Sequence, residues 1–309
     1  MNSGEIKKSY NFDFVIIGGD KRQVYLAEIL AGKGYKVITY AADSEDLPKG
    51  CNRAESLREA VAASDTVITP IPMLTGGEIL HNFPPNVGEG EFPKTKHQDL
   101  SLNNLKNYLE EGQILFGGCM PGEMVSFCEE KGIGHFDFMK EEPITIFNSI
   151  ATAEGIIAEA IMKSPFNLHH SSSLILGYGA CGKTLADKLK GMSVKTTVCA
   201  RKDSLKALAD ANGHRVVSLE NLVNSIGDYD FIFNTIPAVI LDDRLLKEVK
   251  PAAMIFDIAS APGGVDYNRA KELGIKANSY PGLPGKYSPG SSATVLADYI
   301  IIHKNKGKK

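Results

Sequence analysis

The fold is decided by Leu174-Ile175-Leu176-Gly177-Tyr178-Gly179-Ala180-Cys181-Gly182-Lys183-Thr184. In this stretch a short apolar run is followed by the pattern GxGxxG, which is typical of the turn between strand and helix in dinucleotide-binding domains. In that interpretation Gly177 allows the tight turn, Gly179 lets the backbone approach a pyrophosphate, and Gly182 lets the helix pack closely on the strand. The predicted cofactor contacts in the turn are Gly177, Tyr178, Gly179, Ala180, Cys181 and Gly182.

The same stretch also fits GxxxxGKT, the phosphate loop of nucleoside triphosphatases, with Lys183 on the phosphates and Thr184 on magnesium. That interpretation needs an aspartate at the end of another strand, and Asp257 has such a position in the sequence. A glycine turn that binds nothing is the third alternative.

The residues after the turn favour the dinucleotide interpretation. Residues 184–190 have the apolar spacing of a helix and residues 194–199 read as a second strand, which together complete one βαβ unit. NAD-specific sites place an acidic residue at the end of this second strand. The chain instead has Ala200-Arg201-Lys202, and two cations suit a 2′-phosphate. Arg201 and Lys202 therefore predict NADP as the cofactor.

Length and composition indicate a soluble α/β protein. The 309 residues are too many for one ordinary core and suit two domains with a cleft between them. A net charge of −3 gives no indication of nucleic-acid or bulk membrane binding. No apolar run approaches the roughly 20 residues that span a bilayer, and the first residues lack the apolar core of a signal peptide, which predicts a cytoplasmic protein. The five cysteines are scattered without a CxxC pair, so neither disulfides nor a metal site is expected.

Two α/β domains are expected. Residues 1–150 form an N-terminal Rossmann or flavodoxin-like domain for the substrate, and residues 151–290 form a C-terminal Rossmann domain with a doubly wound parallel sheet that binds NADP. A helix over 153–162 connects the domains, and the last helix, within 291–305, packs back on the first. The segment 75–98 is too long for a simple turn and is predicted to be a flap or a dimer contact. The predicted strands are 12–17, 35–40, 66–69, 113–116, 135–138, 174–176, 194–199, 215–217, 230–234, 253–257 and 275–277.

Ligands of an open parallel sheet bind beyond the carboxyl ends of its strands, so the residues that follow each strand are candidate contacts. For the cofactor these residues are Asn234, Thr235, Ile236, Pro237 and Ala259. Ordinary turn chemistry is the alternative explanation for the same residue types. Seven histidines are scattered along the chain, and none of them is nominated as catalytic.

Three regions offer sites for a carboxylate. The turn at Gly18-Gly19-Asp20 is expected to expose free N–H groups at a helix start beside Arg22, which makes an anion site. Lys286, in a glycine-proline loop, can neutralise a carboxylate or transfer a proton. The third region is the predicted start of the connecting helix, with Asn148, Ser149 and Thr152. A solvated helix start, a solvated loop lysine and plain N-capping are the alternatives.

Five blocks of the chain carry a family resemblance: Ile16–Gln23, Phe147–Gly155, Asn234–Pro237, Asp257–Gly264 and Pro281–Gly285. By their order and spacing the chain resembles, nearly end to end, the A subunit of bacterial dipicolinate synthase, in the wider group of dehydrogenases similar to the 2-hydroxyacid and alanine dehydrogenases. The resemblance implies NADP-dependent oxidation of a dihydrodipicolinate-type cyclic imine to pyridine-2,6-dicarboxylate in the mother cell of a sporulating bacterium. The partner that it implies is a small flavoprotein-like B subunit, and a homo-oligomer is expected.

Four positions depart from the family pattern: Ala151, Ala180, Ala261 and Gly290 stand where Pro, a basic residue, Arg and Lys are usual. Other cations must then hold the substrate. Arg22, with the Gly19 and Asp20 backbone, is expected to bind one carboxylate, and Ser149, Thr152 or Lys286 the other. The predicted catalytic residues are Lys286, Arg22, Ser149 and Thr152, and the predicted substrate contacts are Gly19, Asp20, Arg22, Asn148, Ser149, Thr152 and Lys286. The alternative functions are a phosphate-loop NTPase and a non-catalytic NADP-binding scaffold for a partner subunit.

Overall fold

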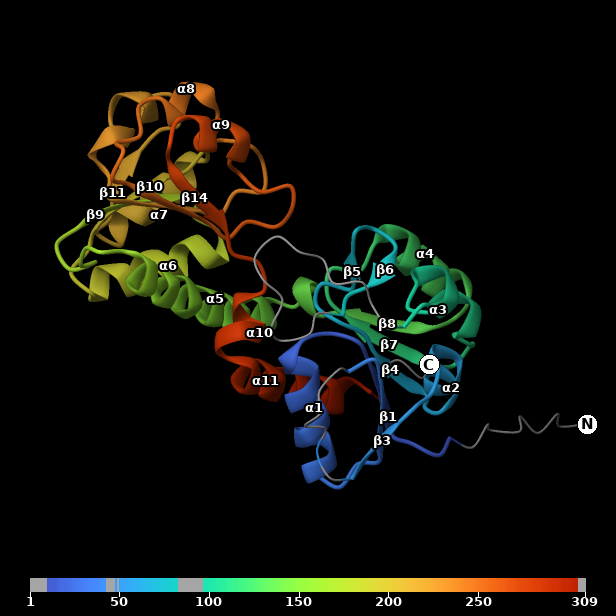
Figure 1. The fold of residues 1–309 in the computed structure, drawn as a ribbon. Helices are drawn as coiled ribbons and strands as arrows, with labels where there is room; N and C mark the ends of the chain where they lie inside the picture. The colour runs from blue at the N-terminus through green and yellow to red at the C-terminus, as the bar shows by residue number, and fades with distance from the viewer. Residues whose placement is uncertain (1–9, 43–47, 49, 83–96, 305–309) are drawn as a thin grey trace, which may run out of the picture. The chain divides into compact units, whose positions relative to one another are not determined.

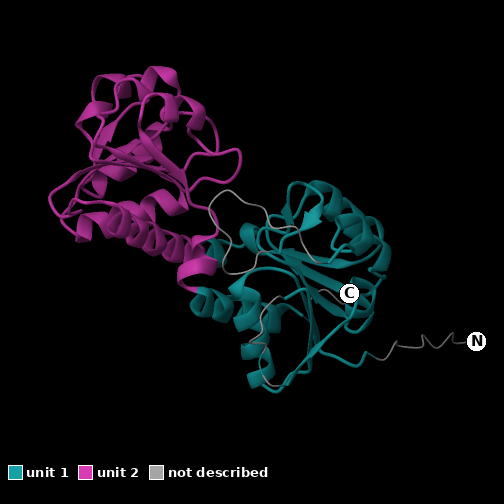
Figure 2. Ribbon diagram, in the orientation of Figure 1, with its two compact units in different colours: residues 1–145, 289–309 teal, residues 146–288 magenta. Residues whose placement is uncertain are grey.

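The structure, a computed structural model, describes residues 10–42, 48, 50–82 and 97–304. The chain folds into two compact units (Figure 2). Unit 1 contains residues 1–145 and 289–309, and unit 2 contains residues 146–288. The final helix thus belongs with the N-terminal sheet, and both boundaries lie a few residues before the expected positions.

Unit 1 is built on a six-stranded parallel sheet in the order β3-β2-β1-β4-β7-β8. This is the strand order of a Rossmann domain rather than of a flavodoxin-like domain. The strands are β1 Phe14–Ile17, β2 Val37–Tyr40, β3 Cys51–Arg53, β4 Thr66–Ile68, β7 Ile114–Gly117 and β8 Gly134–Asp137, and β5 Leu74–Thr75 pairs with β6 Ile79–Leu80 in a hairpin. The helices are α1 Lys21–Gly32, α2 Leu57–Ala62, α3 Leu102–Tyr108, α4 Gly122–Glu130, η1 Phe138–Lys140 and α11 Pro289–His303.

Helices cover both faces of the unit 1 sheet. β1 has the sequence Phe-Val-Ile-Ile and is buried along its whole length, as expected for a central strand of a two-sided parallel sheet. Phe14 and Ile16 point to the face that α1 and α11 cover, and Val15 and Ile17 point to the face of α2, α3 and α4. Figure 1 shows α1 and α11 side by side.

Unit 2 repeats this topology with a parallel sheet in the order β11-β10-β9-β12-β13-β14. The predicted Rossmann fold of the second half of the chain is confirmed, and its topological switch point lies between β9 and β12. The strands are β9 Ser172–Leu176, β10 Lys195–Cys199, β11 Arg215–Val217, β12 Phe231–Asn234, β13 Met254–Asp257 and β14 Lys276–Ser279. The helices are α5 Glu142–Lys163, whose first four residues belong to unit 1, α6 Ala180–Gly191, α7 Asp203–Ala211, η2 Leu222–Asn224, η3 Ile226–Asp228, α8 Asp243–Leu246, α9 Tyr267–Glu272 and α10 Leu283–Tyr287.

The central strand of unit 2 divides its side chains between two cores. Ile175 of β9 packs with α5 and α6 on one face, whereas Leu174 and Leu176 pack with α8 and α9 on the other. Because both faces are covered, the loops after the strands meet solvent at the carboxyl edge of the sheet, where the glycine turn lies.

The connecting helix is longer than predicted. α5 begins at Glu142 rather than near residue 153, because Pro143 lies in its first turn, where a fixed φ and a missing N–H do no harm. The expectation that no apolar run approaches 20 residues is also wrong, because α5 has 22 residues and is apolar enough by composition to cross a membrane. It is nevertheless a core helix, since its apolar face packs in the core of unit 2 through Ala153, Ile156, Ile157 and Ala160.

The predicted flap segment lies only partly within the described residues. Its first part contains β6 and the end of β5, which were not predicted because each strand has only two residues. Residues 83–96 lie outside the described residues. The flap or dimer contact therefore stays a prediction.

Candidate nucleotide site and substrate residues

The glycine turn after β9 has the geometry that each of its glycines was predicted to require. Gly177 has a φ of 95°, and a Cβ atom there would lie 2.4 Å from the Oγ1 atom of Thr235. A Cβ atom on Gly182 would lie 2.3 Å from the carbonyl oxygen of Gly177, so only glycine lets the helix approach the strand this closely. Around Gly179, by contrast, the described residues place no heavy atom within 4 Å of the Cβ position, apart from Gly179 itself and its two neighbours in the chain. The turn is therefore closed on its protein side and open at Gly179.

The first turn of α6 can receive an anion. Gly179 is the N-cap residue and brings no side chain to cap the first N–H groups of the helix. Gly179 and Ala180 are both exposed. Unsatisfied N–H groups and the positive end of the helix dipole favour a phosphate at this place. The residues present thus fit the pyrophosphate of a dinucleotide.

The two cations after β10 are available to a ligand. Arg201 and Lys202 are exposed, and within the described parts of the chain neither forms an ion pair. Ala200, just before them, is 3% exposed and leaves no acidic side chain at the position where a ribose hydroxyl would bind. The arrangement suits a 2′-phosphate.

The other residues predicted to contact the cofactor offer mainly backbone groups to a ligand. Tyr178 is 1% exposed and its hydroxyl accepts a hydrogen bond from Asn212 at 3.1 Å, so its ring belongs to the core. Thr235 donates from Oγ1 to the carbonyl of Leu176 at 2.8 Å and joins the end of β12 to β9. Ile236, Pro237 and Ala259 lie in the loops at the carboxyl edge, where their backbone can contact a ligand.

The triphosphatase interpretation required Asp257 to hold magnesium, and the structure contradicts this role. The Asp257 side chain is fully buried, and both of its oxygens already accept hydrogen bonds. No group of three His, Cys, Asp or Glu side chains in the described part of the chain is placed to hold a metal.

Two predicted substrate residues instead connect α5 to the helix of the glycine turn. The Oγ atom of Ser149 lies 2.8 Å from the Oγ1 atom of Thr184 and donates to the carbonyl of Ile146 at 2.6 Å. Thr152 donates to the carbonyl of Asn148 at 2.8 Å. The expectation that these residues are caps at a helix start is wrong, because α5 begins about two to three turns earlier and places them inside the helix.

The cysteine in the turn is not an activated thiol. Burial raises the pKa of the Cys181 thiol, although a hydrogen bond with Thr152 opposes the rise. A thiol with a raised pKa is a poor nucleophile at neutral pH. Together with Ser149 and Thr184, this contact fixes the start of α6 against α5.

The turn after β1 is filled by its own side chains, so the expectation of free N–H groups there is wrong. The Asp20 carboxylate accepts from the backbone N–H of Arg22 at 2.9 Å, and Gln23 Oε1 accepts from the N–H of Asp20 at 3.0 Å. The N–H of Gly19 donates to the carbonyl of His81 at 2.7 Å. This capping box occupies the place that a substrate carboxylate was predicted to take.

Arg22 already has an intramolecular carboxylate. Its side chain is 4% exposed, and Nη2 lies 2.7 Å from Asp20 Oδ2 and donates to the carbonyl of Ile71 at 2.5 Å. Asp20 is largely buried, which tends to raise the pKa of its carboxyl, but the Arg22 guanidinium outweighs this and holds that pKa below its usual value. Arg22 therefore links the turn to the segment after β4 by hydrogen bonds.

His81 lies beside this pair. Burial and, to a lesser extent, the Arg22 charge lower the pKa of His81 to about 4, although the Asp20 charge opposes the change. Its Nδ1 atom lies 2.6 Å from the hydroxyl of Thr75. No sequence pattern indicated this contact, because the hairpin that brings His81 to the turn was not predicted.

Lys286 is also paired. Its Nζ atom lies 2.5 Å from Oε1 of Glu159, which is 1% exposed, and the hydroxyl of Tyr287 donates to the same oxygen at 2.6 Å. Lys286 itself is 60% exposed. Glu159 was not predicted as a site residue; its sequence signal is an acidic residue on the apolar face of a helix, next to Ile156 and Ala160.

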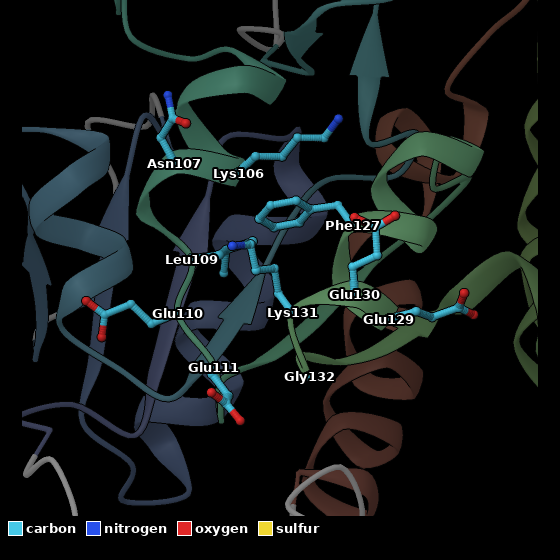
Figure 3. Close-up of a pocket in the computed structure, with 10 residues that line it drawn as sticks. All are labelled: Lys106, Asn107, Leu109, Glu110, Glu111, Phe127, Glu129, Glu130, Lys131 and Gly132. Atoms are coloured by element: carbon cyan, nitrogen blue, oxygen red, sulfur yellow. The ribbon is translucent and has the colours of Figure 1, made fainter.

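The described residues also line a groove of about 830 Å³ in unit 1, between the ends of α3 and α4 (Figure 3). Its lining precedes β7 and β8, so the groove lies at the amino ends of these strands, opposite the edge where parallel sheets bind ligands. Its glutamates repel a dicarboxylate. The lining residues are Lys106, Asn107, Leu109, Glu110, Glu111, Phe127, Glu129, Glu130, Lys131 and Gly132.

Two family models match the chain. The model for the N-terminal domain of dipicolinate synthase A subunits matches residues 13–139, and the NAD-binding domain of D-isomer specific 2-hydroxyacid dehydrogenases matches residues 149–264. The dipicolinate synthase A subunit of Bacillus subtilis (strain 168) is 28% identical over 291 residues, which cover 92% of this chain and 93% of that protein. The chain is a homologue of dipicolinate synthase A subunits over nearly its whole length.

Solved structures agree with this similarity to dipicolinate synthase A subunits. The A subunit from Bacillus halodurans is 25% identical, with a TM-score of 0.79 over 96% of this chain and 98% of that chain. A transhydrogenase from Sinorhizobium meliloti, 12% identical, shares the fold with a TM-score of 0.63 over 96% of this chain and 95% of that chain. Unit 2 is therefore an NAD(P)-binding domain of the dehydrogenase type.

Proposed function

We propose that this chain is the A subunit of a dipicolinate synthase and oxidises a dihydrodipicolinate-type cyclic imine to pyridine-2,6-dicarboxylate with NADP. One observation carries the proposal: the glycine turn of unit 2 is open at Gly179 and is followed by the exposed Arg201 and Lys202. The corresponding turn of unit 1 is filled by Asp20 and Gln23. The two Rossmann units therefore serve different purposes.

Different residues of unit 2 would bind different parts of the cofactor. Backbone N–H groups of residues 179–182 would hold the pyrophosphate, and Arg201 and Lys202 would hold the 2′-phosphate by charge-assisted hydrogen bonds. Residues 234–237 and Ala259 would line the nicotinamide half. When bound, NADP supplies the hydride acceptor.

The remaining task of the protein is to hold a flat dianion and to take up one proton. The ring loses a hydride and a proton, and the aromatic product is the driving force. Lys286 and Arg22 are the proposed cations for the two carboxylates, and Ser149, Thr152 and Asn148 are the proposed uncharged contacts. Lys286 is supported by its exposure and by its ammonium, which has three N–H donors and gives one to Glu159.

The similarity to dipicolinate synthase A subunits also supports a partner and a location. We propose that a flavoprotein-like B subunit works with this chain, that the chain forms a homo-oligomer, and that it functions in the cytoplasm of the mother cell. These statements depend on the relatives rather than on a contact in this structure.

The experiment that tests the proposal is a titration of the purified chain with NADPH, NADH and MgATP. We expect NADPH to bind about tenfold or more tightly than NADH, because two cations face the 2′-phosphate. Replacing both cations, with Arg201→Ser and Lys202→Ser, removes that preference and leaves NADH binding unchanged. Lys195→Ser, at the other end of β10, is the matched control and changes neither affinity.

The same experiment separates the alternative functions. Saturation by MgATP without binding of either dinucleotide contradicts the proposal and supports a triphosphatase. If NADPH binds but the chain with its B subunit forms no pyridine dicarboxylate, measured by its ultraviolet absorbance, the chain is a non-catalytic scaffold.

A further inference from the structure

Asp257, the last residue of β13, is the centre of a buried hydrogen-bond network in unit 2. Its Oδ1 atom accepts from Asn234 Nδ2 at 2.8 Å and from the N–H of Ala259 at 3.0 Å. Its Oδ2 atom accepts from the N–H of Gly264 at 2.8 Å and from the hydroxyl of Tyr267 at 2.8 Å. The four donors come from the end of β12, from both ends of the loop after β13, and from α9.

All four donors are uncharged. In the part of the chain that the structure describes, no Lys, Arg or His forms an ion pair with Asp257, whose side chain is fully buried. A buried carboxylate without a cation is costly and persists only where fixed donors satisfy it. The negative charge is thus held in place but not neutralised.

The network joins the two loops at the carboxyl ends of β12 and β13 to each other. Asn234 also donates to the carbonyl of Ile236 at 3.0 Å and accepts from the N–H of Ile236 at 3.2 Å. A Cβ atom on Gly264 would lie 2.1 Å from Asn234 Nδ2, so the loops touch with no room for a side chain. Neither loop can move without breaking a hydrogen bond to Asp257.

These loops belong to the second half of the Rossmann sheet. A dinucleotide lies across the switch point, and the 2′-phosphate cations Arg201 and Lys202 assign its adenosine end to β10. The nicotinamide end then lies at β12 and β13, the strands whose last residues are Asn234 and Asp257.

We propose that Asp257 is a positioning residue for the nicotinamide, and that its unneutralised charge makes the site prefer the oxidised, positively charged ring over the reduced, neutral ring. The inference rests on the proposed function. Because water is excluded around Asp257, its attraction for a positive ring is weakly screened. Hydride transfer removes the positive charge of the ring, so the reduced cofactor loses this attraction and leaves more readily.

Binding measurements on the full chain test the inference, with calorimetry for NADP+ and nicotinamide fluorescence for NADPH. The chain contains no Trp, so tryptophan emission does not overlap the signal. We expect the wild type to bind NADP+ more tightly than NADPH, and Asp257→Asn to shift the ratio of the two dissociation constants by about tenfold toward NADPH.

Tyr267→Phe is the matched control, because it removes one donor and keeps the charge of Asp257. We expect it to weaken both forms of the cofactor equally and to leave their ratio unchanged, as a pure positioning effect does. Hydrogen exchange of residues 258–264 without cofactor should rise in both variants.

Equal or tighter binding of NADPH by the wild type overturns the inference, and this measurement does not depend on whether Asp257→Asn folds. An unchanged ratio in a folded Asp257→Asn variant overturns it as well. If the wild type binds neither form, the proposed function itself fails, which is a different result.

Discussion

The ammonium of Lys286 lies 2.5 Å from the carboxylate of Glu159, a side chain that is 1% exposed. Tyr287 donates to the same oxygen, and Lys163 Nζ lies 3.6 Å from the other. The hydrogen bond to Glu159 raises the pKa of Lys286, although its partial burial opposes the rise. The pair joins α10 to α5, and the same lysine is a proposed substrate cation.

A pair of variants separates these two roles of Lys286. Lys286→Met and Tyr287→Phe each remove one hydrogen bond from Glu159. Each should lower the free energy of unfolding by about 1 kcal/mol, because Lys286 and Tyr287 are themselves partly exposed to solvent. Only Lys286→Met removes a cation, and we expect it alone to raise the KM for the dicarboxylate. Equal KM values for the two variants, measured with matched unfolding curves, would restrict Lys286 to a structural role.

Three glycine substitutions test the open turn. Gly179→Ala places a methyl group in empty space, so the fold is kept, but the methyl group occupies the space that we assign to the pyrophosphate and cofactor affinity should fall at least about tenfold. Gly191→Ala, at the other end of α6 and also in open space, is the control with normal affinity. Gly182→Ala should lower the melting temperature, because its Cβ atom meets the carbonyl of Gly177. Normal cofactor binding by Gly179→Ala would place the pyrophosphate elsewhere.

Arg22→Ala should reduce stability as well as substrate binding. Its removal leaves the largely buried Asp20 without its cation, which costs about 3 kcal/mol in chemical unfolding. If Arg22 also binds a carboxylate, the KM for the substrate rises strongly while NADP affinity is unchanged. Lys21→Ala removes an exposed cation one residue away and serves as the control. A destabilised Arg22→Ala enzyme with a normal KM would show that Arg22 only braces the turn.

His81 should make stability depend on pH. Its pKa is lowered to about 4 in the folded chain, against about 6.5 when unfolded, so the unfolded state binds a proton first as the pH falls. Stability from this group is fully present above pH 6.5 and is lost progressively toward pH 4, by up to about 3 kcal/mol. The free energy of unfolding, measured in urea, should therefore fall more between pH 7.5 and pH 5 for the wild type than for His81→Gln. Parallel losses in the two proteins would contradict the shift.

Local sequence determined the architecture of each unit and the nucleotide turn. The pattern GxGxxG needs no distant residue to be recognised, because its glycines are fixed by backbone geometry within six positions of one turn. Apolar runs such as Phe-Val-Ile-Ile in β1 predicted buried parallel strands for the same reason, since their burial follows from their own composition. The start of α5 was missed, because Pro143 is compatible both with a break and with a first helical turn.

Tertiary structure alone decided which polar groups are occupied. Arg22 and Lys286 look like free cations in the sequence. Arg22 pairs with the nearby Asp20, but it also donates to the carbonyl of Ile71, 49 positions away, and the partner of Lys286, Glu159, lies 127 positions away. Asp257 has the sequence position of a magnesium ligand, yet Asn234, 23 positions earlier, donates to it in the folded chain. Such pairings depend on how strands and helices pack. A charged or amide group acquires a fixed partner only where packing has excluded water from both groups.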